Sequence, residues 1–215
     1  MSLVEDIGGT FLVSLFIAAI LYGISTLQAF IYYQNYPNDP LMLKSFVALI
    51  CTIETAHTIF CIDFIYNYLI INFGNEGHLG EIYWSVGVTV ICGILMSGVA
   101  HSFYIRRLWI LSRHNIPLTS LVATLALLRL AFGLTAASLL YTNPSWQEFH
   151  SQRLPLTFLA GGLSSGAAAD IVIAIALIVS LRQRRTGFED TDGNIKLLMA
   201  YVINTGLITW FICIL

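Results

Sequence analysis

Long apolar segments alternate with short polar connections along this chain. A helix needs about 20 mostly apolar residues to cross the hydrocarbon core of a bilayer, and six segments meet this length. They predict membrane spans at about 7–33, 42–71, 82–111, 118–141, 155–181 and 194–215. The pattern therefore predicts an all-α fold, a polytopic bundle of transmembrane helices that forms a single domain over residues 1–215.

The connections between the spans carry turn-forming residues. Tyr36-Pro37-Asn38-Asp39-Pro40 ends the first helix, because two prolines and an Asn-Asp pair favour a turn. Glycines and amides between Asn72 and Gly77 end the second span. The stretch 143–154 is predicted to be a polar loop, with Trp146 and Phe149 lying at the membrane interface.

The sixth apolar segment continues to the last residue, Leu215, without a polar flank. We therefore expect that the chain is a truncated gene model or a natural short form, and that at least one further span is missing. Sequencing the 3′ end of the transcript tests this expectation, which a stop codon at that point would contradict.

Composition supports the membrane assignment. The chain is 57% hydrophobic and 10% charged, whereas about a quarter of the residues in a soluble domain are charged. Lipid must solvate much of its surface, so the bilayer is the first expected partner. A net charge of −2 provides no basic stripe for a nucleic acid, and we expect no such partner. Glu5 and Asp6 precede the first apolar segment, which is unlike a secretory signal and predicts a retained first span.

Lysine and arginine are distributed unequally between the two sides of the predicted bundle, and cytoplasmic loops carry the excess of these residues. One side holds eight of them: Lys44, Arg106, Arg107, Arg113, Arg182, Arg184, Arg185 and Lys196. The other side holds only Arg153. The N-terminus is therefore predicted to be extracellular or lumenal, in the plasma membrane or an endomembrane, with the loops after spans 1, 3 and 5 in the cytoplasm. Anionic lipids are the expected partners of these basic loops.

Small residues are concentrated in the fifth span. Gly162 and Gly166 have the GxxxG spacing that lets a neighbouring helix approach closely. We interpret this spacing as helix packing within the protein. Four cysteines lie in apolar segments without a CxxC spacing, so we expect neither a disulfide framework nor a zinc site: Cys51, Cys61, Cys92 and Cys213.

Ionisable side chains inside membrane spans carry the functional hypotheses, because they are energetically unfavourable there. The candidates for a polar network are Glu54, His57, His101, Arg129 and Asp170. We estimate the depth of each residue in the membrane by counting about 1.5 Å per residue from the end of its helix. All but His57 then lie near the middle of a hydrocarbon core about 30 Å thick. Since arginine keeps its proton and needs an anion or carbonyls nearby, we predict that Arg129 pairs with Asp170 or Glu54.

The spacing of Glu54 and His57 also allows a metal hypothesis. Glu-x-x-His occurs in di-metal helix bundles, which need two such pairs, and this chain has one copy. We favour an interhelical hydrogen-bond network of these residues. The alternative is a metal site in which His101 and Asp170 join Glu54 and His57 as ligands. We predict no catalytic residue, no cofactor and no bound metal. Asp63, His78 and His150 are expected to be near water.

Short motifs outside and inside the spans resemble a known family. They are Tyr36-Pro37 with Asp39 and Lys44, Glu54-Thr55 with His57, Asn72 with Gly74-Asn75, Phe103 with Arg106, Trp109 with Leu111-Ser112, Arg185-Thr186-Gly187-Phe188, Thr191-Asp192 and Tyr201-Val202-Ile203-Asn204-Thr205-Gly206. In these motifs the chain resembles fungal (basidiomycete) membrane proteins grouped as domain of unknown function 6534. The resemblance covers nearly the whole chain and implies seven spans with a cytoplasmic C-terminal tail. It implies no activity.

Three classes of function fit these patterns. A receptor- or sensor-like membrane protein is favoured by the predicted topology and by the polar network in the middle of the membrane. A proton-linked transporter or carrier that uses Glu54, Arg129 and Asp170 is the alternative. An intramembrane metal-dependent hydrolase ranks third, because the histidines are few and scattered. The sequence names no small-molecule ligand.

Overall fold

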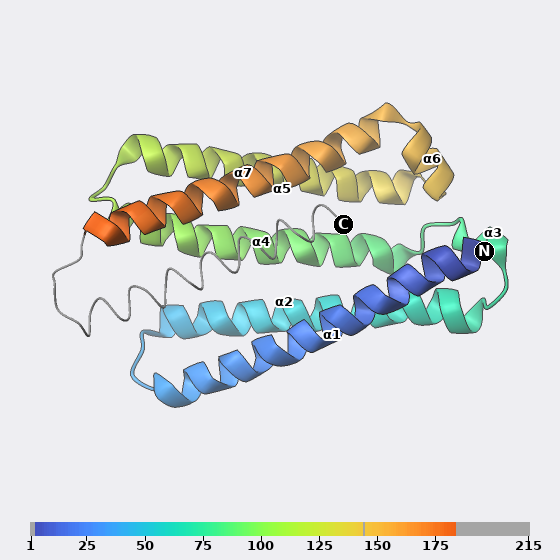
Figure 1. Ribbon diagram of the computed structural model, residues 1–215, viewed down its shortest axis with the longest axis horizontal. Helices are drawn as coiled ribbons and strands as arrows, with labels where there is room; N and C mark the ends of the chain where they lie inside the picture. The colour runs from blue at the N-terminus through green and yellow to red at the C-terminus, as the bar shows by residue number, and fades with distance from the viewer. Residues whose placement is uncertain (1–2, 144, 184–215) are drawn as a thin grey trace. The chain divides into compact units, whose positions relative to one another are not determined.

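The computed structural model describes residues 3–143 and 145–183, which are almost entirely helical. In chain order the elements are α1 (Leu3–Asn35), α2 (Leu41–Tyr66), the π-helical turn η1 (Asn67–Ile71), α3 (Glu76–Leu79), α4 (Trp84–Leu111), α5 (Ile116–Thr142), α6 (Trp146–Ser151) and α7 (Arg153–Gln183) (Figure 1). Apart from one isolated bridge between Glu81 and Ser145, no β-structure occurs in this part of the chain.

Five helices of the described residues are long and apolar enough to cross a membrane: Phe11–Asn35, Leu41–Ile71, Trp84–Leu111, Ile116–Thr142 and Arg153–Ser180. They coincide with the first five predicted spans, and five such helices in one chain are the pattern of an integral multi-pass membrane protein. The sixth predicted span, 194–215, lies outside the described residues, as do Arg184, Arg185, Lys196 and Cys213.

Helix ends differ from the predicted spans by a few residues, because capping groups extend helices beyond the apolar sequence. Helix α5 begins at Ile116, before the predicted start at 118, and the Asn115 side chain accepts the backbone N–H of Leu118 at 3.2 Å. The backbone before it turns sharply, since Arg113 and His114 both have positive φ, 56° and 65°.

Contacts between Cα atoms divide the chain into two compact units. The first unit comprises Met1–Val99 and Leu134–Thr157, and the second comprises Ala100–Gly133 and Phe158–Leu215. Helices α4, α5 and α7 each contribute residues to both units. The two units are described separately below.

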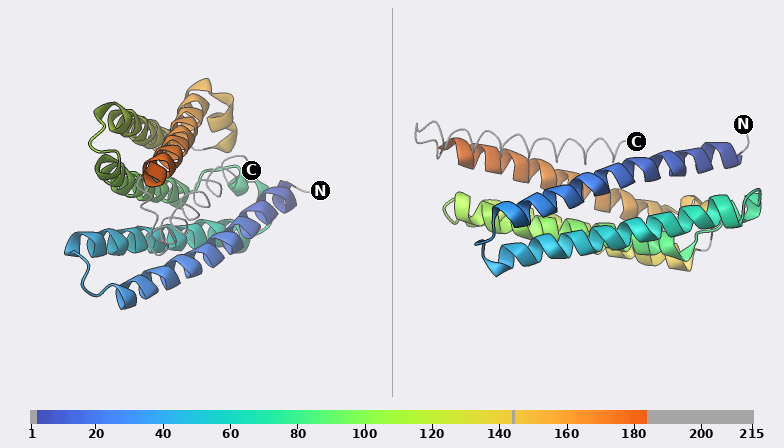
Figure 2. Two further views of the ribbon diagram at one scale, coloured as in Figure 1. Left: turned by 60° about the vertical axis from the view of Figure 1, so that its left-hand side comes forward. Right: turned by 90° about the horizontal axis from the view of Figure 1, so that it is seen from below.

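In the first unit, α1 and α2 form an antiparallel hairpin and lie side by side (Figures 1 and 2). The turn between them contains the two predicted helix-breaking prolines, and the Tyr32 hydroxyl donates to Asp39 Oδ2 at 2.9 Å across it. Most large apolar side chains of α1 are exposed, as expected of a helix surface that lipid covers.

The predicted polar loop at 143–154 contains a short helix instead. The Ser145 side chain accepts the backbone N–H groups of Gln147 and Glu148, at 3.2 and 3.4 Å, and so caps α6. Phe149 is 3% exposed, so this ring packs inside the protein and does not lie at the interface as predicted. The spacing of Trp146 and Phe149 by three residues puts both on one helix face, which explains why a six-residue helix forms here.

The core of the second unit is built by α4, α5 and α7. Leu108, Val122 and Leu177 are fully buried in it, together with Ile173 and Ala176. Each helix contributes an apolar face, and the three faces enclose a core that excludes lipid. This core lies near the α4–α5 turn. The polar residues His101, Arg129 and Asp170 lie one to two helical turns away from the core along the same helices.

Candidate functional site

A histidine–aspartate pair, in which the histidine is buried and the aspartate half-buried, lies in the second unit. His101 on α4 is 4% exposed, and its Nε2 is 3.0 Å from Oδ1 of Asp170 on α7. The two residues are 69 positions apart in sequence, with the whole of α5 and α6 between them, so packing of the helices brings them together. Both belong to the predicted polar network. An ionisable pair inside a span is unfavourable unless each group has a partner, and this contact supplies one to each.

Arg129 lies against α7 at a glycine. A Cβ atom added to Gly166 would overlap the Arg129 guanidinium, with Cζ at 2.7 Å and Cδ at 2.9 Å, so the missing side chain makes room for the arginine. In the described part of the chain, Arg129 makes no ion pair within 4.0 Å, and its buried Nη1 has no hydrogen-bond partner. The predicted ion pair with Asp170 is therefore not formed there, and His101 takes that carboxylate instead.

The glycines of the predicted GxxxG spacing face α5. A Cβ atom added to Gly162 would lie 3.5 Å from the backbone nitrogen of Gly133. A Cβ atom added to Gly161 would lie 3.1 Å from the ring of Phe132. The spacing therefore serves close packing of α7 against α5 within this protein, as predicted.

Polar side chains join α1 to α2 in the first unit. The Ser25 hydroxyl donates to Glu54 Oε2 at 2.6 Å. One turn away, the Tyr22 and Thr55 hydroxyl oxygens are 3.1 Å apart. His57 contacts Cys61 on the same helix face, with Nδ1 to Sγ at 3.7 Å. Glu54 and His57 therefore belong to the first unit, and the convergence of all five candidates into one network stays a prediction.

No metal-binding group of three or more His, Cys, Asp or Glu side chains occurs among the residues that the structure describes. His101 and Asp170 form a pair without a third such ligand, and the His57 contact adds only a thiol. A structural zinc site takes four ligands and a catalytic site three. The contacts that these residues make are hydrogen-bonded pairs, and the favoured interhelical network stays a prediction.

The connections at one end of the first unit form a compact cap, which comprises η1, α3, α6 and the connector 80–83. Tyr68 lies at its centre and is 1% exposed. Its hydroxyl donates to the backbone oxygen of Glu81 at 2.7 Å and accepts the backbone N–H of Tyr83 at 2.8 Å. The ring packs among aromatic neighbours, which include Phe11, Phe64 and Tyr83. Tyr68 therefore ties the connector to the end of α2.

His78 makes a second link in the cap, although it was expected to be solvated. Its side chain is 25% exposed. Nε2 lies 2.9 Å from Asn67 Oδ1, and Nδ1 lies 3.2 Å from Glu81 Oε2. Asp63 also differs from the expectation of a position near water, because its Oδ2 is buried and has no hydrogen-bond partner among the described residues. His150 is exposed, and its Nδ1 lies 2.9 Å from the backbone oxygen of Trp146.

Helix α6 is joined to the connector by backbone contacts. The Trp146 N–H donates to the backbone oxygen of Gly80 at 2.9 Å, beside the bridge between Glu81 and Ser145. The Gln152 side chain in turn donates to Asn143 Oδ1 at 2.9 Å across α6. The two connections of the cap, α2–α4 and α5–α7, are therefore held together.

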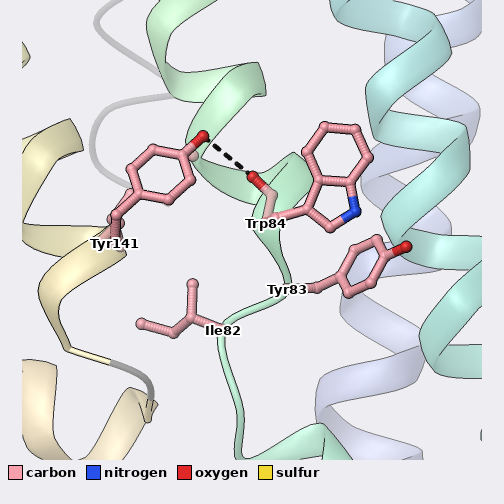
Figure 3. Close-up of a pocket in the computed structure, with 6 residues that line it drawn as sticks. Ile82, Tyr83, Trp84 and Tyr141 are labelled. Atoms are coloured by element: carbon pink, nitrogen blue, oxygen red, sulfur yellow. Dashed lines mark hydrogen bonds between the residues drawn. The ribbon is translucent and has the colours of Figure 1, made fainter.

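A cavity of about 160 Å³ lies beside the connector in the first unit. It is lined by Ile82, Tyr83, Trp84, Gly87, Leu140 and Tyr141 (Figure 3). The Tyr141 hydroxyl donates to the backbone oxygen of Trp84 at 3.1 Å and so links α5 to the start of α4. Gly87 is essential to this arrangement, because a Cβ atom there would lie 2.5 Å from the Tyr141 ring.

Sequence patterns predicted the residues of the polar pairs and missed the cap and the pocket. His101 and Asp170 were found because charged residues are conspicuous in apolar segments. Tyr68, Tyr83 and Tyr141 were overlooked, since a tyrosine near a span end is expected at a membrane interface whether or not it packs inside the protein. The density of polar and aromatic side chains between Asn67 and Trp84 was the available signal.

Comparison with known proteins finds one family. Neither the curated proteins nor the solved structures include a match to this chain. Residues 166–215 match the model of a family of unknown function, DUF6534. The matched residues contain the Arg-Thr-Gly-Phe and Asn-Thr-Gly motifs on which the resemblance was based. The C-terminal part of the chain is therefore similar to DUF6534, a family of unknown function.

Proposed function

We propose that this chain is a receptor- or sensor-like membrane protein that takes a small, largely apolar ligand in the pocket beside the connector. The observation that carries the proposal is the aromatic cavity itself, between the start of α4 and the end of α5. Ligand pockets are concave and mainly apolar, with a few polar groups that orient the ligand. Here the Tyr141 hydroxyl and the Trp84 carbonyl supply such groups.

The size of the cavity limits the ligand. An apolar cavity of about 150 Å³ accommodates a molecule the size of benzene, and this one has about 160 Å³. The Tyr141 ring offers an aromatic face, while the Trp84 and Tyr83 rings lie on the other side of the connector (Figure 3). Aromatic rings prefer offset or edge contacts with each other. A single aromatic ring with one hydroxyl group, such as phenol, matches this size and chemistry.

The predicted orientation supports a sensor. The excess of lysine and arginine lies in the connections at the opposite ends of these spans, and that side is the cytoplasmic one by the positive-inside rule. The pocket and the cap then face the exterior or the lumen. A ligand outside the cell reaches them without crossing the membrane, and α4 and α5 connect the pocket to the basic turn at Arg113.

The test uses the native tryptophans as reporters. Protein labelled with 5-fluorotryptophan is reconstituted in nanodiscs and titrated with phenol, and ¹⁹F spectra are assigned with Trp84→Phe. We expect the Trp84 resonance to shift with phenol concentration until the pocket is saturated. Trp109 does not line the pocket, so its resonance should change only as phenol partitions into the lipid. Equal, unsaturable shifts of both resonances would contradict the proposal.

A matched pair of glycine variants adds a control. Gly87→Ala pushes the Tyr141 ring into the pocket and should weaken phenol binding about tenfold, which corresponds to ~1.4 kcal/mol. Gly93→Ala adds the same methyl group to the same helix where no atom lies within 4 Å, and should leave the affinity unchanged. A receptor also requires that phenol alter amide exchange in the α4–α5 turn, because binding without a transmitted change is no signal.

A proton-linked carrier is the second candidate, and the part-buried pair of His101 and Asp170 favours it. Histidine and carboxylate pairs inside spans occur in proton relays. Pyranine-loaded liposomes under an imposed membrane potential measure the expected proton flux. Asp170→Asn should abolish it and Asp63→Asn, which changes a span carboxylate of the first unit, should not. Absence of flux in the wild-type protein would exclude this candidate.

A further inference from the structure

Besides Tyr68, a histidine side chain joins the connector 80–83 to η1. His78 bridges Asn67 on η1 and Glu81 on the connector, and its two ring nitrogens make one contact each. The distances, 2.9 and 3.2 Å, are those of hydrogen bonds. The Tyr68 ring lies beside the imidazole, with ring centroids 5.9 Å apart. His78 therefore occupies a structured position between two elements of the cap.

The neighbours of His78 determine how many protons it must carry. The Asn72 amide nitrogen lies 3.2 Å from the backbone oxygen of Asn67, which can only accept a hydrogen bond. The same nitrogen lies 3.2 Å from Asn67 Oδ1, so that oxygen is an acceptor too. Nε2 of His78 faces this acceptor, and Nδ1 faces a carboxylate, which when ionised also only accepts.

Both ring nitrogens therefore need a proton to complete the two bonds. A neutral imidazole has one N–H and leaves the other nitrogen with a lone pair directed at an oxygen. The imidazolium donates from both nitrogens and adds a charge-assisted bond to Glu81. Histidine is the side chain whose charge ordinarily changes between about pH 5 and 8.

Among the side chains that the structure describes, the other titratable groups around the histidine do not supply this switch. From η1, the Tyr68 hydroxyl is already bonded to Glu81 and Tyr83. From α6, Glu148 is exposed and His150 contacts its own helix. From α2, Asp63 lies one turn before Asn67, with an unpartnered oxygen in the described part of the chain. Glu81 is the charged group in direct contact with the ring.

We propose that the cap is a proton sensor, in which protonated His78 clasps the connector to η1 and loss of the proton loosens it. On the acid side both bonds are formed and the connector is held at Glu81. As the pH rises, one bond is lost, while Tyr68, α6 and the backbone bonds to α3 continue to hold the connector. The connector continues directly into Trp84, so the proton controls the order of the segment that begins α4. The inference does not depend on a ligand in the pocket.

Hydrogen–deuterium exchange of the full-length protein in nanodiscs tests the clasp. Exchange is measured at pH 5.5 and 8.0 and divided by the intrinsic rate of an unstructured peptide at each pH. In the wild type, the protection of residues 79–84 should fall about five- to tenfold as the pH rises, the change expected for loss of one hydrogen bond. In His78→Gln it should not change with pH. Equal wild-type protection at both pH values would overturn the proposal.

Glu81→Gln provides a second variant that retains the histidine. The amide can accept from a protonated Nδ1 or turn and donate to an unprotonated one, so neutral His78 forms both bonds. Protection of 79–84 should then stay high at pH 8.0 as well as at pH 5.5. His150→Gln and Asp63→Asn are the controls and should keep the wild-type fall. A fall that persists in Glu81→Gln, or that disappears in either control, would refute the clasp even if His78→Gln did not fold.

Discussion

Gly166 shows how one missing side chain allows a cation inside a membrane span. The arginine opposite it cannot lose its proton, so it needs space that lets it approach polar backbone or water. The glycine provides that space on the surface of α7. A neighbouring glycine, Gly162, brings the α5 backbone close on the same face. The small residues of α7 thus shape the position of Arg129 as well as the packing distance of two helices.

Gly166→Ala is expected to destabilise the protein by about 1–3 kcal/mol, the range for an extra methyl group in a packed core. The reason is the overlap with the Arg129 guanidinium. In an Arg129→Ala background the same change should have little effect, because the overlapping atoms are gone. Unfolding in mixed micelles with sodium dodecyl sulfate measures both free energies. Equal losses in the two backgrounds would show that the overlap does not determine the effect.

Helix α1 illustrates what fixes a helix whose apolar side chains mostly face lipid. Lipid tails are as apolar as leucine, so burial against a neighbour yields no hydrophobic gain of the kind that operates in water. Polar contacts and close packing then decide the partner. Ser25 and Tyr22 on α1 meet Glu54 and Thr55 on α2 at one level of the hairpin. These contacts set the register of α1 against α2.

A double-mutant cycle on Ser25 and Glu54 should give a coupling energy of about 0.6–1.7 kcal/mol, between the average and the maximum measured for hydrogen bonds between membrane helices. The variants are Ser25→Ala, Glu54→Ala and their combination, and the measurement is unfolding in detergent. Ser25→Ala with Thr26→Ala is the control pair, since Thr26 bonds to its own helix at the Tyr22 carbonyl. A Ser25–Glu54 coupling near zero would mean that this contact does not hold the hairpin.

At the scale of the molecule, the spans in the described part of the chain were predictable and the contacts between distant segments were not. A span depends on the summed hydropathy of about 20 residues, and the first five predicted spans coincide with long apolar helices. Counting along each helix put His101 and Asp170 at a similar level, because the rise per residue is fixed, and the two side chains are in contact. Depth does not give direction around the helix axis. The pairing of Asp170 with His101 in place of Arg129 therefore required the structure.

The cap was unpredictable for a related reason. Gly80 and Trp146 have no pattern that links them, because a backbone hydrogen bond needs no particular side chain. His78 looked like a solvated loop residue until the positions of Asn67 and Glu81 were known. Periodicity describes which face of a helix is apolar, and it contains no information about how two connections meet.

Membrane topology is testable with single cysteines in a background in which the native cysteines are replaced. Asn38→Cys and His114→Cys, at exposed positions in the connections of the basic side, should react with a membrane-impermeant maleimide only after the membrane is opened. Phe73→Cys and Gln147→Cys, exposed in the cap region, should react in intact cells or sealed right-side-out vesicles. Reaction of both pairs from the same side would contradict alternating spans, and the reverse pattern would contradict the predicted orientation.

The bond between Trp146 and Gly80 has a consequence for the biogenesis of the protein. Its two residues are separated by the whole of α4 and α5, which the ribosome must complete before the second partner exists. Chains are synthesised at about 5–20 residues per second, so the connector emerges seconds before the backbone that completes the cap. The cap is thus a late step of assembly, and its closure reports that the α4–α5 hairpin has been inserted correctly.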